Sequence, residues 1–360
     1  MAALIRNVVL NPLVTGPLLI LFTVGPQQVR EPILESLKSY SYYRPVERGL
    51  LALKWLFGLG LAGSVHGFLS ELGQNNFRLR SEKHRYDWPN EIAVVTGAAS
   101  GFGRLISEGL AAKGIRVMAL DLHDSLPADM PPNEKINYYK CDITSAEAVN
   151  AVADAIRSDY GNPSILVNNA GIAFDTSIMA TSPEKLRRIF DVNTLSHYFT
   201  VQALLPSMVK QRKGHIVTMA SMASFLSGPH QMKLGPHADK TYRNRGMVHY
   251  CMTKSAALTF HEGLAAELRT NRLGFAAPEI KLTCVHPTWA ATPMIAPHRS
   301  NIDKTGMTVI DPQLVADAVV NQILSGRGRQ ILLSGGMDFL STMRAWPSWI
   351  TGGIGAVLCE

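Results

Sequence analysis

A short strand-like run that leads into a glycine-rich turn is the feature that most constrains the fold of this chain. Ile92–Thr96 is apolar and β-branched. The turn after it contains Gly97, Gly101 and Gly103, and a helix-like run begins near Arg104. Glycines between a strand and a helix let the backbone approach a phosphate group at the positive N-terminus of the helix. The order of strand, glycines and helix therefore predicts a dinucleotide site.

Short β-branched runs continue from Glu91 onward and alternate with segments of helical period. This is the pattern of a parallel sheet covered by helices on both faces. The expected strands are Ile92–Thr96, Ile115–Asp121, Ile136–Cys141, Ile165–Asn168, His215–Ala220, Ile280–His286 and Gln330–Leu333. Seven such runs predict one doubly wound α/β domain of the Rossmann type. With 46% hydrophobic and 18% charged residues the chain can build a buried core, which excludes a disordered protein.

Two apolar stretches precede this domain, Val8–Val24 and Gly49–Ser70. The second would measure about 33 Å as a helix, which reaches across a bilayer. Pro17 interrupts the first stretch, and Lys54 and His66 are costly at the centre of a membrane. We therefore expect an apolar helical anchor, either as two spans or as a hairpin in one leaflet. A helical subdomain packed on the body is the alternative, and a cleaved signal peptide is disfavoured.

The predicted organisation has four parts. They are an apolar helical segment that associates with a membrane (1–75), a polar and basic linker (76–90), the catalytic domain (91–335) and an apolar tail (336–360). The basic residues beside the apolar stretches indicate that the catalytic domain faces the cytosol. Because Arg344 and Pro347 break the tail, it is expected to lie on a membrane surface or to pack on the core.

The formal net charge of +7 comes without any Lys/Arg-rich run. Nucleic acid is therefore not an expected partner, and proximity to anionic lipid is favoured. The cysteines are far apart and form no metal-binding pattern, so free thiols and no metal site are predicted. They are Cys141, Cys251, Cys284 and Cys359.

Tyr250 and Lys254 are spaced i,i+4, which places a phenol and an ammonium on one face of a helix. An adjacent ammonium favours the phenolate and is expected to lower the pKa of the phenol, so the pair can move a proton. Such pairs also occur on ordinary solvated helix faces. Asp121 ends the second expected strand, where a carboxylate can accept the two ribose hydroxyls of NAD and repel a 2′-phosphate. A turn or cap role for Asp121 is the alternative, and nearby Arg104 leaves NADP open.

With these motifs in place, the chain resembles the short-chain dehydrogenase/reductase family from about Glu91 to Leu333. Residues 96–103 resemble its T-G-x-x-x-G-x-G motif, 141–143 its adenine-contacting strand end, and 168–171 its N-N-A-G signature. Residues 287–292 resemble its P-G-x-x-x-T region, although Thr288 stands where glycine is usual. The resemblance implies cofactor contacts from Gly97, Ser100, Gly101, Phe102, Gly103, Asp121, Asp142, Ile143, Asn169, Ala170, Gly171, Tyr250, Lys254, Pro287 and Thr292.

The resemblance also implies a catalytic set of Asn193, Ser221, Tyr250 and Lys254. Tyr250 would take or give the proton of the alcohol, and Ser221 would hydrogen-bond the substrate oxygen. Lys254 would bind the nicotinamide ribose and favour the phenolate, and Asn193 would hold a water. Two other serines, Ser224 and Ser227, lie close to Ser221 in the sequence. The position of Ser221 directly after its strand favours it over both.

An insertion from Gly228 to His249 separates the serine from the tyrosine by more than the family's usual dozen residues. It contains four basic residues, Lys233, Lys240, Arg243 and Arg245. It is expected to lie beside the substrate opening, as a lid or as a surface for an anionic substrate or lipid headgroup. A long surface loop without such a role is the alternative.

An apolar anchor followed by this domain resembles the membrane-associated branch that includes retinol and hydroxysteroid dehydrogenases. The resemblance implies a lipophilic alcohol or carbonyl substrate of retinoid, steroid or fatty-alcohol type, with NAD as cofactor. It implies the endoplasmic reticulum or a lipid droplet as the location, membrane lipid as a partner, and leaves a homodimer open. The alternatives are a soluble biosynthetic reductase and a dinucleotide-binding scaffold without turnover. The complete catalytic set argues against the scaffold, and the glycine spacing argues against a sugar-nucleotide epimerase.

Overall fold

The computed structural model describes residues 8–39, 45–226, 246–270, 276–304 and 308–351. The chain divides into two compact units, Met1–Gly73 and Gln74–Glu360. The predicted insertion after Ser221 lies outside the described residues up to position 245, and so do the last nine residues of the tail.

The N-terminal unit consists of helices: α2 (Pro12–Thr23), α3 (Gln27–Ser39) and α4 (Pro45–Gln74), whose last residue belongs to the second unit. Within the described residues, α4 is the one helix that is long and apolar enough to cross a membrane, over Glu47–Gln74. A helix of the length of α2 measures about 18 Å, well short of the roughly 30 Å core of a bilayer. Of the two arrangements expected for the anchor, two full spans is therefore not supported by the described residues, because α2 is too short to cross a bilayer.

The second unit contains a seven-stranded sheet in which every strand pair is parallel. The strand order is β3-β2-β1-β4-β5-β6-β7. The strands are β1 (Ile92–Thr96), β2 (Arg116–Asp121), β3 (Ile136–Lys140), β4 (Ile165–Asn168), β5 (His215–Met219), β6 (Lys281–Pro287) and β7 (Arg329–Leu333). Every predicted strand is present, and each boundary agrees within one residue. The doubly wound fold is confirmed.

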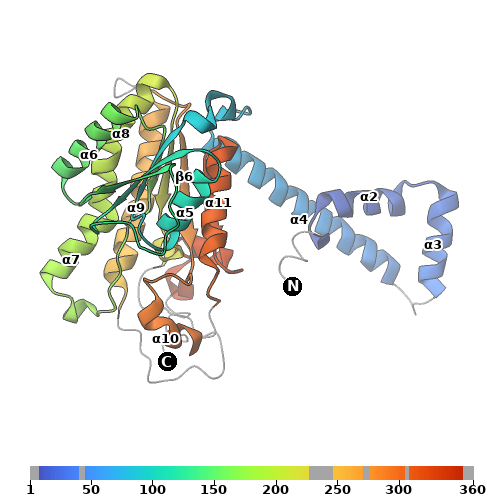
Figure 1. The fold of residues 1–360 in the computed structure, drawn as a ribbon. Coiled ribbons are helices and arrows are strands. Elements are labelled where there is room, and N and C mark those ends of the chain that lie inside the picture. Colours follow the sequence, from blue (N-terminus) through green and yellow to red (C-terminus); the bar gives the residue numbers. More distant parts are fainter. Residues whose placement is uncertain (1–7, 40–44, 227–245, 271–275, 305–307, 352–360) are drawn as a thin grey trace. The chain divides into compact units, whose positions relative to one another are not determined.

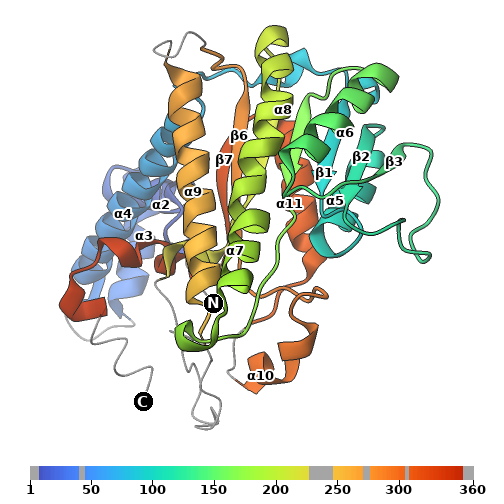
Figure 2. The ribbon, with the colours of Figure 1, turned by 90° about the vertical axis from the view of Figure 1, so that its left-hand side faces the viewer.

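Helices cover both faces of this sheet, as Figures 1 and 2 show. One face packs against α5 (Gly101–Ala111) and α11 (Pro312–Ser325), and the other against α6 (Ala146–Asp159), α8 (Ser196–Gln211) and α9 (Val248–Arg269). Because the central strands are buried on both faces, they read in the sequence as continuous apolar runs without alternation.

The strand order reverses between β1 and β4, because the chain adds β2 and β3 on one side of β1 and the remaining strands on the other. At such a switch point the connections after the two strands leave in opposite directions and open a crevice at the carboxyl edge of the sheet. The fold therefore places the glycine turn after β1 and the N-N-A-G stretch after β4 on the two sides of one crevice.

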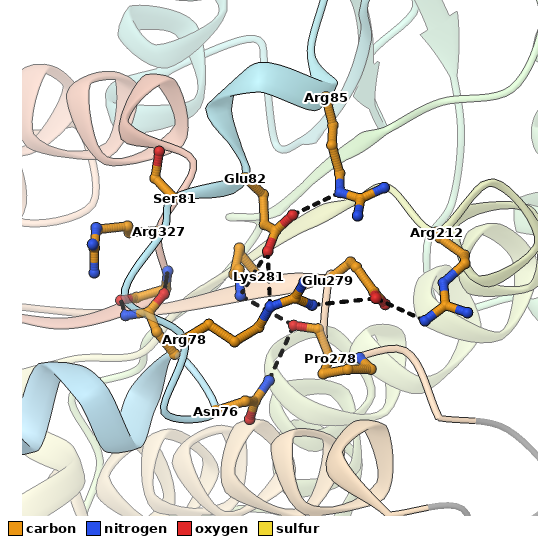
Figure 3. A network of polar contacts seen from close by, with 12 residues as sticks. Asn76, Arg78, Ser81, Glu82, Arg85, Arg212, Pro278, Glu279, Lys281 and Arg327 are labelled. Atoms are coloured by element: carbon orange, nitrogen blue, oxygen red, sulfur yellow. Dashed lines mark hydrogen bonds and ion pairs between the residues drawn. The ribbon is translucent and has the colours of Figure 1, made fainter.

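The segment predicted as a linker, 76–90, packs into the same unit as the sheet. Glu82 is buried and forms ion pairs with Arg78 at 3.3 Å and Arg85 at 2.6 Å, and with Lys281 at the start of β6 at 3.9 Å. Figure 3 shows this network, in which Arg78 also reaches Glu279 at 3.2 Å. Since a buried carboxylate is costly without partners, these contacts tie the segment to the sheet.

The beginning of the tail also packs on the body. A short 3₁₀ helix, η9 (Asp338–Ala345), buries Leu340 and Met343 against Met222. Of the two expectations for the tail, core packing therefore holds for this part.

Candidate active site

A cavity of about 480 Å³ opens at the carboxyl edge of the sheet. Its walls come from the segments that follow all seven strands, together with the first turns of α9. Every predicted site residue except Gly103 and Asn193 lines it. The parallel sheet brings these residues together because all its strands end on the same side.

The glycine turn leaves no room for side chains. Gly97 has a φ of +65°, and a Cβ there would lie 2.8 Å from the Cα of Ala170. A Cβ on Gly103 would lie 2.1 Å from the carbonyl oxygen of Gly97. Helix α5 begins at Gly101, and the side chain of its N-cap, Ser100, makes no capping bond to the helix. The turn thus presents backbone N–H groups and a hydroxyl to the cavity, a cradle that fits a pyrophosphate.

The N-N-A-G stretch is tied to this turn by Thr96. The hydroxyl of Thr96 accepts hydrogen bonds from the backbone N–H of Asn169 at 3.0 Å and of Ala170 at 3.1 Å. The Asn169 side chain donates to the carbonyl of Thr96 at 2.9 Å and to that of Gly97 at 3.2 Å. These bonds fix the distance between the two sides of the crevice.

Asp121 lies at the end of β2 with its carboxylate facing the cavity. One oxygen accepts from the backbone N–H of Ala99 at 2.9 Å, and the other from that of Leu122 at 2.8 Å. The ring of His123 is 2.6 Å from the second oxygen. Leu122 and His123 take up the second oxygen, and the first oxygen keeps one lone pair beside the bond from Ala99. Asp121 therefore stabilises the glycine turn and can still accept one hydrogen bond, so the turn role is compatible with a contact to one ribose hydroxyl.

Arg104 does not reach the cavity. Its guanidinium pairs with Glu108 at 3.0 Å and with Asp129 at 2.6 Å, and it is not among the cavity residues. Both partners hold the Arg104 guanidinium away from the residues that line the cavity. The helix itself begins at Gly101, three residues earlier than the sequence predicts.

The other predicted cofactor residues also line the cavity. Asp142 and Ile143 follow β3. Thr292, which ends the 287–292 region, lies close to the glycine turn, since a Cβ on Gly101 would be 3.6 Å from its side chain. Phe102 and Pro287 complete the lining.

Ser221 caps a 3₁₀ turn, η6 (Met222–Phe225), directly after β5. Its hydroxyl accepts from the N–H of Ala223 at 3.2 Å and donates to the carbonyl of Pro287 at 3.3 Å. Of the rival serines, Ser224 is buried and does not line the cavity, and Ser227 lies outside the described residues.

Tyr250 and Lys254 lie on the first turns of α9 and face the same cavity. The Lys254 ammonium is 5.8 Å from the centre of the Tyr250 ring and donates to the carbonyl of Met219 at 2.8 Å. The Ser221 hydroxyl lies close enough to the Tyr250 hydroxyl to lower the pKa of the phenol. The structure thus brings the proposed proton donor, the serine and the lysine together in one cavity.

Asn193 is fully buried in a single π-helical turn, η5 (Asp191–Leu195), behind Gly171. Its amide donates to the carbonyl of Ile172 at 2.9 Å and to the hydroxyl of Thr253 at 3.1 Å, while its oxygen accepts from the N–H of Ile172 at 2.8 Å. Both donors are therefore used within the protein. A water predicted at this side chain can bind it only through the second lone pair of the oxygen.

Burial controls the electrostatics of the proton-transfer pair. It raises the pKa of Tyr250 to about 12, although the nearby Ser221 hydroxyl acts in the opposite direction. It also lowers the pKa of Lys254 to about 8. The sequence predicted the opposite direction for Tyr250. The expectation fails because desolvation of the buried phenol is the largest effect on its pKa.

The remaining wall of the cavity is apolar and rich in methionine, and the motifs do not predict it. Its members are Phe174, Met222, Leu226, Met247, Trp289, Met294, Met337, Leu340 and Met343. They come from five separate segments, so no local pattern in the sequence marks them as neighbours. Methionine is unbranched and adapts to irregular shapes, so this wall suits a flexible, lipophilic molecule.

Known proteins are similar to this chain in sequence and in architecture. A short chain dehydrogenase family profile matches residues 91–233. Dehydrogenase RED2 of Cochliobolus heterostrophus is 37% identical over 215 residues, which cover 59% of this chain and 72% of that protein. The chain belongs to the short-chain dehydrogenase/reductase family. It is therefore an oxidoreductase that acts on CH–OH groups and binds a nicotinamide dinucleotide.

Two further comparisons place it within this short-chain dehydrogenase/reductase family. Human estradiol 17-beta-dehydrogenase 11 is 29% identical over 269 residues, which cover 72% of this chain and 80% of that protein. A short-chain dehydrogenase from Streptomyces avermitilis has a solved structure that matches with a TM-score of 0.57 and 26% identity. That match covers 74% of this chain and 96% of the other. The similarity thus extends to the hydroxysteroid dehydrogenase branch of the short-chain dehydrogenases.

Replacing Asp121 is expected to move the cofactor preference of this short-chain dehydrogenase toward NADP. Asp121→Ser removes both the acceptor for the ribose hydroxyls and the repulsion of a 2′-phosphate, which should raise the NADP-to-NAD ratio of kcat/KM about tenfold or more. Asp121→Asn is the matched control for shape, because its oxygen can still accept from Ala99. Competition kinetics of the two cofactors measure the ratio, and an unchanged ratio in both variants would refute the assignment.

Proposed function

We propose that this protein is a membrane-associated, NAD(H)-dependent oxidoreductase that interconverts a lipophilic alcohol and its aldehyde or ketone. The observation that carries the proposal is the cavity itself. Ser221, Tyr250 and Lys254 line the same cavity as the glycine turn that can cradle a dinucleotide, and the methionine-rich wall adds an apolar lining.

Each catalytic side chain has a proposed role that its contacts support. The Tyr250 hydroxyl moves the proton of the alcohol, and its raised pKa keeps it protonated at neutral pH, as proton donation to a carbonyl requires. Ser221 turns its hydroxyl from the Pro287 carbonyl, its acceptor in this structure, to the substrate oxygen, where charge develops. Lys254 lies beside Gly171 and binds the ribose, and Asn193 holds the backbone of Ile172 in place. A bound nicotinamide supplies the hydride acceptor.

NAD is the proposed dinucleotide because Asp121 is the charged side chain at the end of β2 and Arg104 is held elsewhere. The similarity to an estradiol dehydrogenase supports a lipophilic alcohol or ketone as substrate. So does the methionine-rich wall, whose described side chains are apolar.

Helix α4 supports membrane association. Its side chains Leu51, Trp55 and Leu59 are each more than half exposed, whereas apolar side chains of this size are ordinarily buried. A bilayer that dissolves the substrate also concentrates it near an enzyme held there. The proposed location is an intracellular membrane or a lipid droplet, with the catalytic unit in the cytosol.

Deletion of residues 1–73 tests the anchor and the substrate class together. We expect the full chain to sediment with membranes and to need detergent for release, and the shortened chain to stay soluble. The shortened chain should keep its kcat/KM for a short, water-soluble alcohol and lose about tenfold or more for a long-chain alcohol presented in vesicles. A full chain that is soluble without detergent contradicts the anchor. Loss of both activities in a shortened chain that is folded by circular dichroism contradicts the substrate argument.

A further inference from the structure

His286 is a buried histidine at the end of β6 to which the sequence motifs assign no role. It directly precedes Pro287 and has no exposed surface. Its imidazole packs against the ring of Phe225, with the two ring centres 4.7 Å apart. Phe225 is the last residue of η6, the turn that Ser221 caps. The histidine therefore packs against the segment that presents the catalytic serine.

Both ring nitrogens of His286 have partners. Nδ1 is 3.1 Å from the backbone carbonyl oxygen of Ser221, and Nε2 is 3.1 Å from the side-chain nitrogen of Gln330. A carbonyl oxygen only accepts, so Nδ1 carries the hydrogen and Nε2 accepts from the Gln330 amide. Gln330 can reach the ring because it pairs in register with Cys284, which lies two residues before His286 and on the same face of β6.

The end of β6 therefore holds Ser221 in two ways. His286 donates to the serine's carbonyl, which also accepts from the N–H of Ser224 at 2.9 Å. Pro287, the next residue, accepts from the serine's hydroxyl at 3.3 Å. Fixing the peptide plane on one side and the hydroxyl on the other limits the directions that the hydroxyl can take. Burial lowers the pKa of His286 to about 4, so the ring is neutral at physiological pH.

We propose that His286 is a positioning residue for the reaction: its Nδ1–H holds the Ser221 carbonyl, and Gln330 selects the tautomer that can do so. The inference rests on the proposed role of Ser221 in binding the substrate oxygen. His286 itself touches no substrate, since it does not line the cavity.

Two amide substitutions separate this role from simple packing. In His286→Asn the amide nitrogen is as many bonds from Cβ as Nδ1, so it can still donate to Ser221. In His286→Gln it is as many bonds away as Nε2, so it reaches Gln330 and leaves the carbonyl without this donor. Both variants bury an amide at the same place and should lose similar stability.

We expect His286→Asn to keep kcat within about threefold of the wild type and His286→Gln to lose about tenfold or more, the equivalent of one hydrogen bond. The dissociation constant for NAD and the melting temperature should match between the two variants. Equal kcat values for the Asn and Gln variants, in an enzyme whose wild type is active, would overturn the inference while the proposed function stands.

The tautomer gives a readout that does not need activity. In ¹⁵N-histidine-labelled protein at neutral pH, the resonance that His286→Asn removes should report the neutral, Nδ1-protonated ring. An Nε2-protonated or charged ring would overturn the inference. If the wild type turns over no alcohol or ketone, the proposed function fails, and this spectrum still decides whether His286 holds the serine's carbonyl.

Discussion

Replacing Tyr250 with Phe is expected to lower kcat by about 10³-fold or more, because the substitution keeps the ring and removes the oxygen that moves the proton. The dissociation constant for NAD should change little, since the ring still fills the same part of the cavity beside Lys254. Steady-state kinetics with the best substrate of a panel, together with calorimetry of NAD binding, measure the two effects separately.

Tyr198→Phe is the matched control. Tyr198 lies on α8 with half of its side chain exposed and packs against Phe260, outside the cavity. Its variant should keep kcat within about twofold, as is usual for a surface substitution. If the Tyr250 variant retained a tenth of the wild-type rate, another group would have to carry the proton, and the assignment of Tyr250 would fail.

Mild acid is expected to destabilise the protein strongly. Burial lowers the pKa values of four histidines far below 6.5, to about 3 or about 4, so their rings are neutral in the folded state. They are His197, His215, His261 and His286. As the pH falls below 6.5, the unfolded chain binds protons that the folded chain does not, so stability is lost.

The magnitude follows from the 1.36 kcal/mol that one pKa unit represents. Between pH 6.5 and pH 5 each such histidine lowers the free energy of unfolding by about 2 kcal/mol. Four of them approach the whole stability of an ordinary domain, which is about 5–15 kcal/mol. Ordinary carboxylates titrate below this window, so the two effects separate. Urea unfolding of the full chain in detergent at pH 7.5, 6 and 5 measures the loss.

His197→Leu is the matched variant for this prediction. Within the described residues neither ring nitrogen of His197 has a hydrogen-bond partner, and the ring packs against Phe260. Leucine therefore removes the titration without breaking a hydrogen bond, and the slope of stability against pH should fall by about one proton. A free energy of unfolding that stays constant from pH 7.5 to 5 would show that these rings are charged or solvated in the folded protein.

The sheet was predictable because its central strands are buried on both faces. Such strands must be apolar throughout. Continuous apolar runs such as Val94–Val95 and Leu166–Val167 therefore indicate strands that are covered by helices on both sides. The glycine turn was predictable for a related reason: at Gly97 and Gly103 any Cβ would collide with the backbone or with Asn169. Because only glycine fits at these two positions, the glycines themselves indicate the tight turn.

Features that depend on distant partners were not predictable. The segment around Glu82 resembles a linker because it is polar, and the pairs of Glu82 with Arg78 and Arg85 are local. Its ties to the sheet unit are the ion pairs of Glu82 with Lys281 and of Arg78 with Glu279, which join positions about two hundred residues apart. The contacts of His286 were not predictable for the same reason, because its two partners are Ser221 after β5 and Gln330 on β7. The sign of the Tyr250 pKa shift also depends on burial, which the spacing to Lys254 does not report.

Transfer of deuterium from substrate to cofactor tests the central claim most directly. The full chain in detergent or vesicles is incubated with NAD and a panel of alcohols, retinoid, steroid and fatty, that carry deuterium on the carbinol carbon. We expect deuterated NADH, detected by mass spectrometry, from at least one lipophilic alcohol and not from the Tyr250→Phe variant. A wild-type protein that binds NAD by calorimetry and forms no deuterated NADH with any member of the panel would contradict the account.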